Sequence, residues 1–215
     1  MNLTISGLLG TGGEEIAMYL EEKYNYRRVG KQLVTQASDM YAATSKKAAK
    51  RAFYDETMDA KPDNSVLNAT LHLYLDVMPE AMVNRGQSYH LSREQSEMFV
   101  ALRKVIRATF EENDKVIFMG RCAGHVLRRE NGCINILTVD TPENCRARVA
   151  KAFDMDDDKE IKKLIRETNS RRINFYEIFT GLEWGNPENF DYCITPSILG
   201  IEKTAELIAG ILGRS

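Results

Sequence analysis

Short apolar runs that alternate with helix-type segments restrict the fold of this chain more than any other feature. The residues 2–6 (NLTIS), 115–120 (KVIFMG) and 133–140 (CINILTVD) are typical of buried strands, and a helical pattern follows each of them. Weaker signals predict further strands at 24–29 and 191–195. Since strands that are buried on both faces and separated by helices form parallel sheets, we predict an α/β fold around a parallel sheet.

The helices predicted between these strands carry start and stop signals. Thr141, Pro142 and Glu143 combine a capping hydroxyl, a proline at the first helical position and an acid in the first turn. The segment 154–181 predicts two helical stretches, and Gly181 is their expected stop. Further helices are predicted over 13–24, 121–129 and 200–212.

The segment 30–112 has no strand alternation and is predicted to be mainly helical. Ser92 and Gln95 match a capping box, which predicts a helix that ends at about residue 112. We interpret 30–112 as an insertion between strands rather than as a separate domain. An apolar helix predicted over 65–82 could bury against the same chain or against a second copy, so a monomer and a homo-oligomer both remain open.

Charge and composition exclude several classes of partner. The 215 residues carry 29 bases and 31 acids, a net charge of −2, so no basic field favours nucleic acid or an anionic membrane. No apolar run approaches membrane-spanning length, and the N-terminus does not resemble a signal peptide. The four cysteines form no C-x-x-C pair, and we interpret them as buried free thiols. Together these features predict a soluble cytoplasmic protein.

A glycine-rich turn joins the first predicted strand to the first predicted helix. Gly7 and Gly12 have the spacing of a phosphate-binding loop, but Gly13 and Glu14 replace its lysine and its hydroxyl residue. The backbone N–H groups of 10–14 could still point together at one anion beside a helix N-terminus. The alternative is a plain tight turn. We favour phosphate binding.

Arginines lie where they could neutralise phosphate. Arg121 follows the strand 115–120 between two glycines, and it could fork onto phosphate or carboxylate or merely cap the sheet edge. Two later segments hold more arginines, which could assist phosphoryl transfer or form a solvated basic face paired with nearby acids. These are Arg146, Arg148, Arg166, Arg171 and Arg172.

Acidic residues give weaker signals. Asp140 ends a strand, as a magnesium-organising carboxylate often does, but we favour a role in helix entry before Thr141. Asp55 and Glu56 are interpreted as solvated surface. The acid run 154–158 lacks the glycine and glutamate of a calcium loop and is interpreted as a helix start.

Three stretches of this chain resemble the cytidylate kinase-like family of P-loop proteins. They read TISGLLGTGGEEIAMYLEEKY (4–24), VIFMGRCAGHVL (116–127) and NSRRINFYEIFTGLEWGNPENFDYCITPS (169–197). They occur in the family's order, and the resemblance covers nearly the whole chain. The lysine-free G-[ST]-G-G loop is typical of that family.

The resemblance implies one domain over residues 1–215, with the fold of similar nucleoside monophosphate kinases. That fold is a P-loop NTPase-type three-layer sandwich with a parallel five-stranded sheet. It would include a helical substrate-region insertion at 30–112 and an arginine-bearing lid at 154–184.

The resemblance also implies site residues and cofactors. Gly10, Thr11, Gly12, Gly13 and Glu14 would bind the phosphates of ATP, and Mg²⁺ would bridge those phosphates, held mostly by phosphate and water. Arg121 would contact the acceptor. Arg171 and Arg172 would be catalytic lid arginines, with Arg148 in support.

Three positions depart from the family pattern. Gly7 stands where the family usually has arginine, Gly124 replaces a common aspartate, and Asn169 stands where an aspartate often precedes the lid arginine. Each change removes a charge that could order phosphate or metal.

The expected function is transfer of the ATP γ-phosphoryl group to a nucleoside monophosphate, with CMP as the first candidate. A nucleotide-binding or regulatory module without turnover is one alternative, which the missing lysine and hydroxyl motivate. A kinase of another small acceptor is the other, because the long insertion could shape a different pocket.

Overall fold

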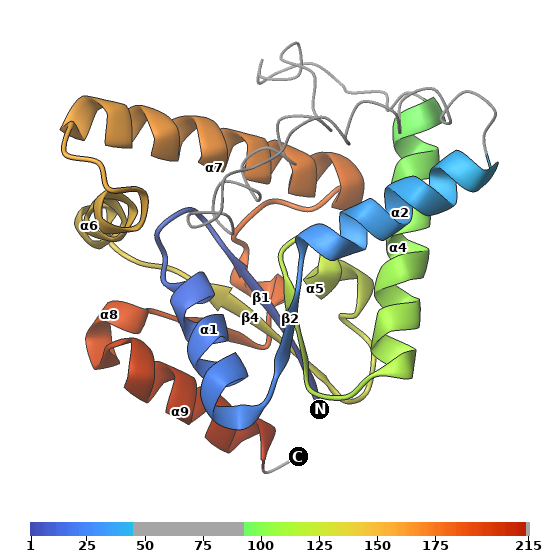
Figure 1. Ribbon diagram of the computed structural model, residues 1–215, viewed down its shortest axis with the longest axis horizontal. Coiled ribbons are helices and arrows are strands. Elements are labelled where there is room, and N and C mark those ends of the chain that lie inside the picture. The colour runs from blue at the N-terminus through green and yellow to red at the C-terminus, as the bar shows by residue number, and fades with distance from the viewer. Residues whose placement is uncertain (45–92, 214–215) are drawn as a thin grey trace.

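Five parallel strands form the centre of the molecule. The computed structural model describes residues 1–44 and 93–213. Within these residues the strands have the order β2-β3-β1-β4-β5, and every neighbouring pair is parallel (Figure 1). The α/β fold with a parallel five-stranded sheet is therefore confirmed. The strands are β1 (Asn2–Gly7), β2 (Arg27–Val29), β3 (Val116–Met119), β4 (Cys133–Thr138) and β5 (Tyr192–Ile194).

Helices cover both faces of the sheet and bury two apolar clusters against it. On one face, α1 (Gly13–Tyr24) and α9 (Ile201–Leu212) pack together over β1. On the other face, α2 (Lys31–Thr44), α4 (Arg93–Glu112) and α5 (Ala123–Val126) cover β3. Side chains of β3 alternate between the clusters, because successive residues of a strand point to opposite faces. The result is three layers.

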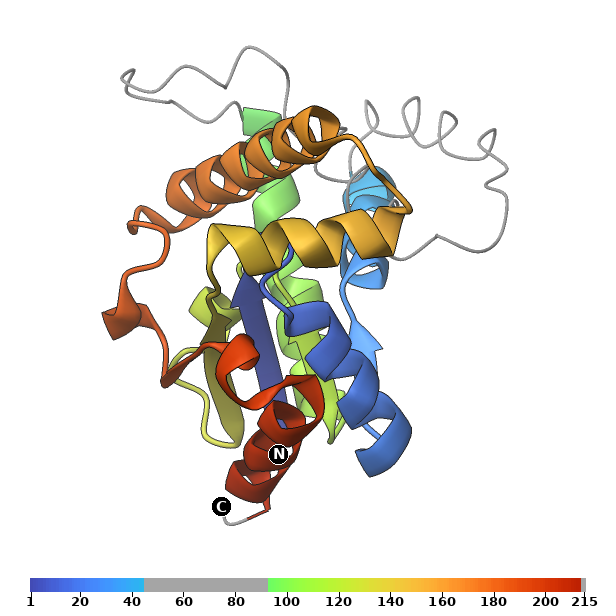
Figure 2. The same ribbon diagram turned by 90° about the vertical axis from the view of Figure 1, so that its left-hand side faces the viewer.

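Two further helices lie beyond the carboxyl ends of the strands. Figure 2 shows α6 (Pro142–Phe153) and α7 (Asp158–Thr180) above the carboxyl end of β1. A third apolar cluster, formed by Leu9, Val149 and Ile161, packs both helices against the loop that follows β1. The capping pattern read from the sequence is confirmed, since the Thr141 hydroxyl accepts the Asn144 N–H at 3.2 Å. The remaining short helices are η4 (Pro187–Asn189) and α8 (Pro196–Leu199).

The predicted pair of helical stretches over 154–181 is wrong. Asp154 takes a left-handed conformation (φ 52°) and ends α6, and the Asp157 side chain then accepts two N–H groups at the start of α7. From there α7 continues without a break to Gly181, because no glycine or proline lies inside it. The acid run therefore caps a helix, as expected.

Two other predicted elements differ from the structure. The helix expected over 121–129 is limited to the four residues of α5, because Gly120, Arg121 and Cys122 form a left-handed turn before it. The thiol of Cys193 is exposed, whereas we expected buried thiols; Cys122 and Cys145 are buried.

Several sequence predictions fall outside the described residues. These are the helix over 65–82, the capping residue Ser92, and the interpretation of Asp55 and Glu56 as surface. Among the residues that the structure does describe, no helix is both long and apolar enough to cross a membrane.

Candidate functional site

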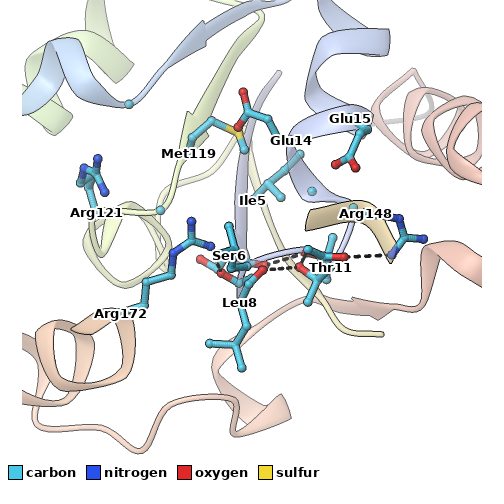
Figure 3. Close-up of a pocket in the computed structure, with 18 of the residues that line it drawn as sticks. Ile5, Ser6, Leu8, Thr11, Glu14, Glu15, Met119, Arg121, Arg148 and Arg172 are labelled. Atoms are coloured by element: carbon cyan, nitrogen blue, oxygen red, sulfur yellow. Dashed lines mark hydrogen bonds between the residues drawn. The ribbon is translucent and has the colours of Figure 1, made fainter. Parts of the chain in front are cut away.

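A cavity of about 220 Å³ lies at the carboxyl edge of the sheet. The ends of the central strands meet there, since Ile5 pairs in register with Met119 and Gly7 with Thr138. The loop after β1, the residues that follow β2 and β3, and the helices α6 and α7 all line it (Figure 3). The site therefore combines the chemistry of segments that are far apart in the sequence.

The glycine loop has the backbone geometry of an anion cradle. Gly10 and Gly12 take positive φ values of 84° and 89°, which glycine adopts without strain. The N–H of Ile16 makes the first intrahelical bond of α1, to the Gly12 carbonyl at 3.1 Å. The N–H groups of 13–15 precede that bond and have no intrahelical acceptor. With the positive end of the helix dipole, they can bind one anionic oxygen cluster.

Two arginines and one asparagine hold the loop by its backbone. Arg172 Nη1 donates to the Gly7 carbonyl at 2.9 Å, and Arg148 Nη1 donates to the Gly10 carbonyl at 3.0 Å. The Asn169 Oδ1 accepts the Leu9 N–H at 2.8 Å. In the view of Figure 3, Arg148 and Arg172 approach the loop from opposite sides. The loop is thereby fixed between α6 and α7.

Three arginines from different elements line the cavity. Arg121 comes from the turn after β3, Arg148 from α6 and Arg172 from α7. Arg121 is only 4% exposed and has a φ of 57°, so its placement is set by an unusual backbone turn as well as by packing. The other predicted arginines, Arg146, Arg166 and Arg171, are not among the lining residues.

Glu14 occupies the position of the usual hydroxyl residue, and it is paired. Its Oε1 accepts from Arg28 Nη1 at 2.5 Å, and Arg28 Nε also bonds Glu21. Burial raises the pKa of Glu14, while the Arg28 guanidinium opposes that shift. Glu14 therefore brings a carboxylate of raised pKa to the part of the cavity beside the glycine loop.

The side chain of Asp140 is buried, and its carboxylate accepts four hydrogen bonds. The N–H of Thr141, the Asn144 amide and the Ser197 hydroxyl bond Oδ1 at 2.8, 2.9 and 2.7 Å, and Arg148 bonds Oδ2 at 2.7 Å. Burial would raise the pKa of Asp140, but the hydrogen bonds from Asn144, Ser197 and Arg148 together hold it well below its ordinary value. Three of these four donors share Oδ1, so the hydrogen bonds fix the carboxylate in one orientation.

Sequence reasoning missed a lysine and an aromatic wall. Lys31, the first residue of α2, lines the cavity from the end of β2, two strands from the loop. Trp184 and Tyr176 form an edge-to-face pair with ring centroids 5.1 Å apart, and both line the cavity with Phe175. A cation that directly follows a predicted strand end would have pointed to Lys31. The aromatic wall forms because the segment after α7 places Trp184 beside Tyr176, and no local sequence pattern reveals that contact.

Two departures from the family pattern have a steric explanation. A Cβ at Gly7 would lie 2.3 Å from Thr138 Oγ1 and 2.5 Å from Thr11 Oγ1, two hydroxyls that are 2.8 Å apart. A Cβ at Gly124 would lie 2.3 Å from Asn135 Oδ1. In this chain, neighbouring polar side chains fill the space that a larger residue would need. The glycines are part of a packed arrangement.

The described fold and site define a class of α/β protein in which a glycine-rich loop joins the first strand of a parallel sheet to its first helix, and an arginine-lined cavity lies at the carboxyl edge of that sheet. The chain matches the family model described as the cytidylate kinase-like family over residues 2–198. The chain belongs to this family.

Solved structures share the fold at low sequence identity. An uncharacterized protein from Eubacterium ventriosum is 16% identical with a TM-score of 0.65, covering 100% of this chain and 99% of that one. A shikimate kinase from Bacteroides thetaiotaomicron is 13% identical with a TM-score of 0.51, covering 99% and 98%. TT1252 from Thermus thermophilus is 13% identical with a TM-score of 0.51, covering 99% and 97%. No curated protein matches the chain.

Proposed function

We propose that this protein is a phosphotransferase that moves the γ-phosphoryl group of ATP to a nucleoside monophosphate, with CMP as the first candidate. One observation carries the proposal: the N–H groups at the start of α1 and three arginines from three separate elements converge on one cavity. Phosphoryl transfer needs positioning and charge neutralisation more than covalent chemistry, and this arrangement suits both.

The roles follow from the positions along the sheet edge. The loop 10–14 would bind the donor phosphates through its backbone. Arg148 and Arg172 would supply the positive charge that a loop lysine would otherwise provide. Arg121 and Lys31, which follow β3 and β2, would face the acceptor. The aromatic wall around Trp184 suits a planar base.

Magnesium would be held mainly by phosphate oxygens and water. Among the described residues, no three His, Cys, Asp or Glu side chains cluster as a metal site. Asp140 does not line the cavity and Glu14 is paired with Arg28, which leaves Glu15 as the carboxylate at the cavity with no salt bridge inside the described ranges. Mg²⁺ commonly keeps several waters and bridges substrate phosphates, so this donor set is compatible with it. When bound, it would neutralise charge on the donor phosphates.

The lid region 154–184 would complete the site. Because α7 already contacts the loop through Arg172 and Asn169, ordering of this region over ATP would exclude water from the transferred group. The same contacts suit a module that binds nucleotide without turnover, so activity has to be measured.

The test is ADP release with a panel of nucleoside monophosphates, in parallel with calorimetric ATP binding. The panel also includes shikimate, because a solved protein with this fold is a shikimate kinase. Turnover that is fastest with CMP is the expected result. ATP binding without turnover on any acceptor would contradict the kinase proposal and favour the binding module. Turnover on a non-nucleotide acceptor alone would correct the acceptor class.

Arg172 and Arg171 provide a matched pair within that test. Arg172→Ala is expected to lower kcat by about a hundredfold or more and to weaken ATP binding by a smaller factor, because Arg172 would act on charge that develops in the transition state as well as on the bound donor phosphates. Arg171→Ala changes the neighbouring residue of α7, which does not line the cavity. A large loss in both variants would support two catalytic lid arginines, and a large loss in Arg172→Ala alone would restrict that role to Arg172.

A further inference from the structure

One terminal nitrogen of the Arg148 guanidinium is hydrogen-bonded to the protein, and its other two nitrogens are available to a ligand. Nη1 carries two hydrogens, and its two acceptors are Asp140 Oδ2 at 2.7 Å and the Gly10 carbonyl at 3.0 Å. Within the described residues, Nε and Nη2 make no recorded hydrogen bond, and the side chain lines the cavity. Three donors of a planar, oriented guanidinium are thus left for a ligand.

Asp140 fixes that orientation from outside the cavity. It does not line the cavity, its side chain is fully buried, and Asn144 and Ser197 hold its other oxygen. Arg148 remains 19% exposed, so the pair joins a rigid buried carboxylate to a partly exposed cation. Gly10 packs against the same helix, since a Cβ there would lie 2.5 Å from the Cys145 carbonyl. Helix α6, the loop and Asp140 form one rigid unit.

We propose that Asp140 is a positioning residue, which holds the Arg148 guanidinium against the loop so that its remaining N–H groups bind the phosphates of the donor nucleotide. The inference rests on the proposed nucleotide site, but not on turnover. The nearby carboxylate offsets part of the arginine charge. In return it removes the rotational freedom that a long side chain would otherwise lose on binding phosphate.

The test is a double-mutant cycle on phosphate affinity. ATP and pyrophosphate binding are measured by calorimetry for wild type, Asp140→Asn, Arg148→Ala and the double variant. Asparagine has nearly the same shape, but it cannot form the ion pair with Arg148. We expect Asp140→Asn to weaken ATP binding about tenfold, and the double variant to bind no more weakly than Arg148→Ala. A merely structural role of Asp140 would instead lower affinity in both backgrounds.

Asp191→Asn is the matched control. Asp191 also accepts a backbone N–H beside a strand, from Asn135 at 2.7 Å, but it does not line the cavity and does not contact Arg148. Its substitution is expected to change stability without changing ATP affinity. If Asp140→Asn does not fold, Ser197→Ala replaces it in the cycle, because the Ser197 hydroxyl reaches Arg148 only through Asp140.

The outcomes separate this inference from the kinase proposal. Unchanged ATP affinity in Asp140→Asn, or additive losses in the double variant, would overturn the positioning role. Wild-type protein that binds ATP but transfers no phosphoryl group would overturn the kinase proposal alone. Wild-type protein that binds neither ATP nor pyrophosphate would overturn both.

Discussion

Single side chains at the cavity show how this site manages charge without a loop lysine. Arg148 and Arg172, which lie on two different helices, donate hydrogen bonds to carbonyls of the loop. The positive charge beside the loop therefore comes from residues that are distant from it in the sequence. Glu14 has the opposite effect on the local charge, because its carboxylate places negative charge beside the same loop. Arg28, from β2, compensates that carboxylate through a contact at 2.5 Å.

Glu14 gives the site a predicted pH dependence. As pH falls through its raised pKa, Glu14 loses its negative charge and repels phosphate less, so ATP affinity should rise at a pH above the one at which an ordinary glutamate titrates. The same sign applies to stability: the folded state binds this proton more tightly than the unfolded chain does. The Glu14 contribution is therefore present at low pH and is lost as pH rises through the folded pKa.

The measurement is ATP affinity against pH at constant ionic strength, for wild type and Glu14→Gln. Titration of ATP itself affects both proteins equally, so the difference between them reports Glu14. Parallel curves would contradict the prediction.

At the scale of elements, α7 contacts the glycine loop that follows β1. The prediction of a lid at 154–184 did not include this contact. Asn169 replaces an acid of the family pattern, yet it keeps an acceptor for the Leu9 N–H at 2.8 Å. Leu9 itself is buried between α6 and α7. The helix therefore stabilises the loop by a hydrogen bond and by apolar packing.

Asn169→Ala is expected to lower the free energy of unfolding by about 1–2 kcal/mol. The variant leaves the Leu9 N–H without its acceptor in a largely buried place, and the higher helix propensity of alanine offsets only part of that loss. Asn169→Asp retains an acceptor and should stay close to wild type. Urea unfolding of the three proteins is the measurement, and equal stability of the alanine and aspartate variants would refute the role of this bond.

At the scale of the whole molecule, local charge outweighs net charge. The chain has 31 acids and 29 bases, but Arg121, Arg148, Arg172 and Lys31 gather at one cavity, where the acids among the described lining residues are Glu14 and Glu15. Attraction of an anionic ligand is therefore a property of this cavity and not of the overall field.

Trp184 can report on the proposed acceptor end, because it is the one tryptophan of the chain and it lines the cavity. We expect CMP to change its fluorescence in a saturable manner, since a base that packs beside the indole excludes water from it. Pyrophosphate, which has no base, should produce a smaller change. Trp184→Phe provides the blank. Equal changes with CMP and pyrophosphate would contradict a base-binding role for the aromatic wall.

The sequence predicts the sheet well and the site only in part. Strand runs such as 133–140 and the capping residues around Thr141 are visible because burial and capping leave local patterns. The family resemblance indicates Arg121, Arg148 and Arg172 as site residues without any structural information. The role of Lys31 and the four-donor environment of Asp140 were not predicted, because they depend on contacts such as that between Ser197 and Asp140, 57 residues apart.

The left-handed turn at 120–122 limits how the proposed acceptor end can change through evolution. Arg121 and Cys122 both have positive φ, which is unfavourable for most side chains and especially for β-branched ones. Substitution of Arg121 by a β-branched residue is therefore strongly disfavoured, and glycine, asparagine and aspartate, which tolerate this backbone readily, would remove the positive charge. Lys31 begins an ordinary helix and has no such restriction. New acceptor preferences in this lineage should therefore arise first around Lys31, while Arg121 stays constant.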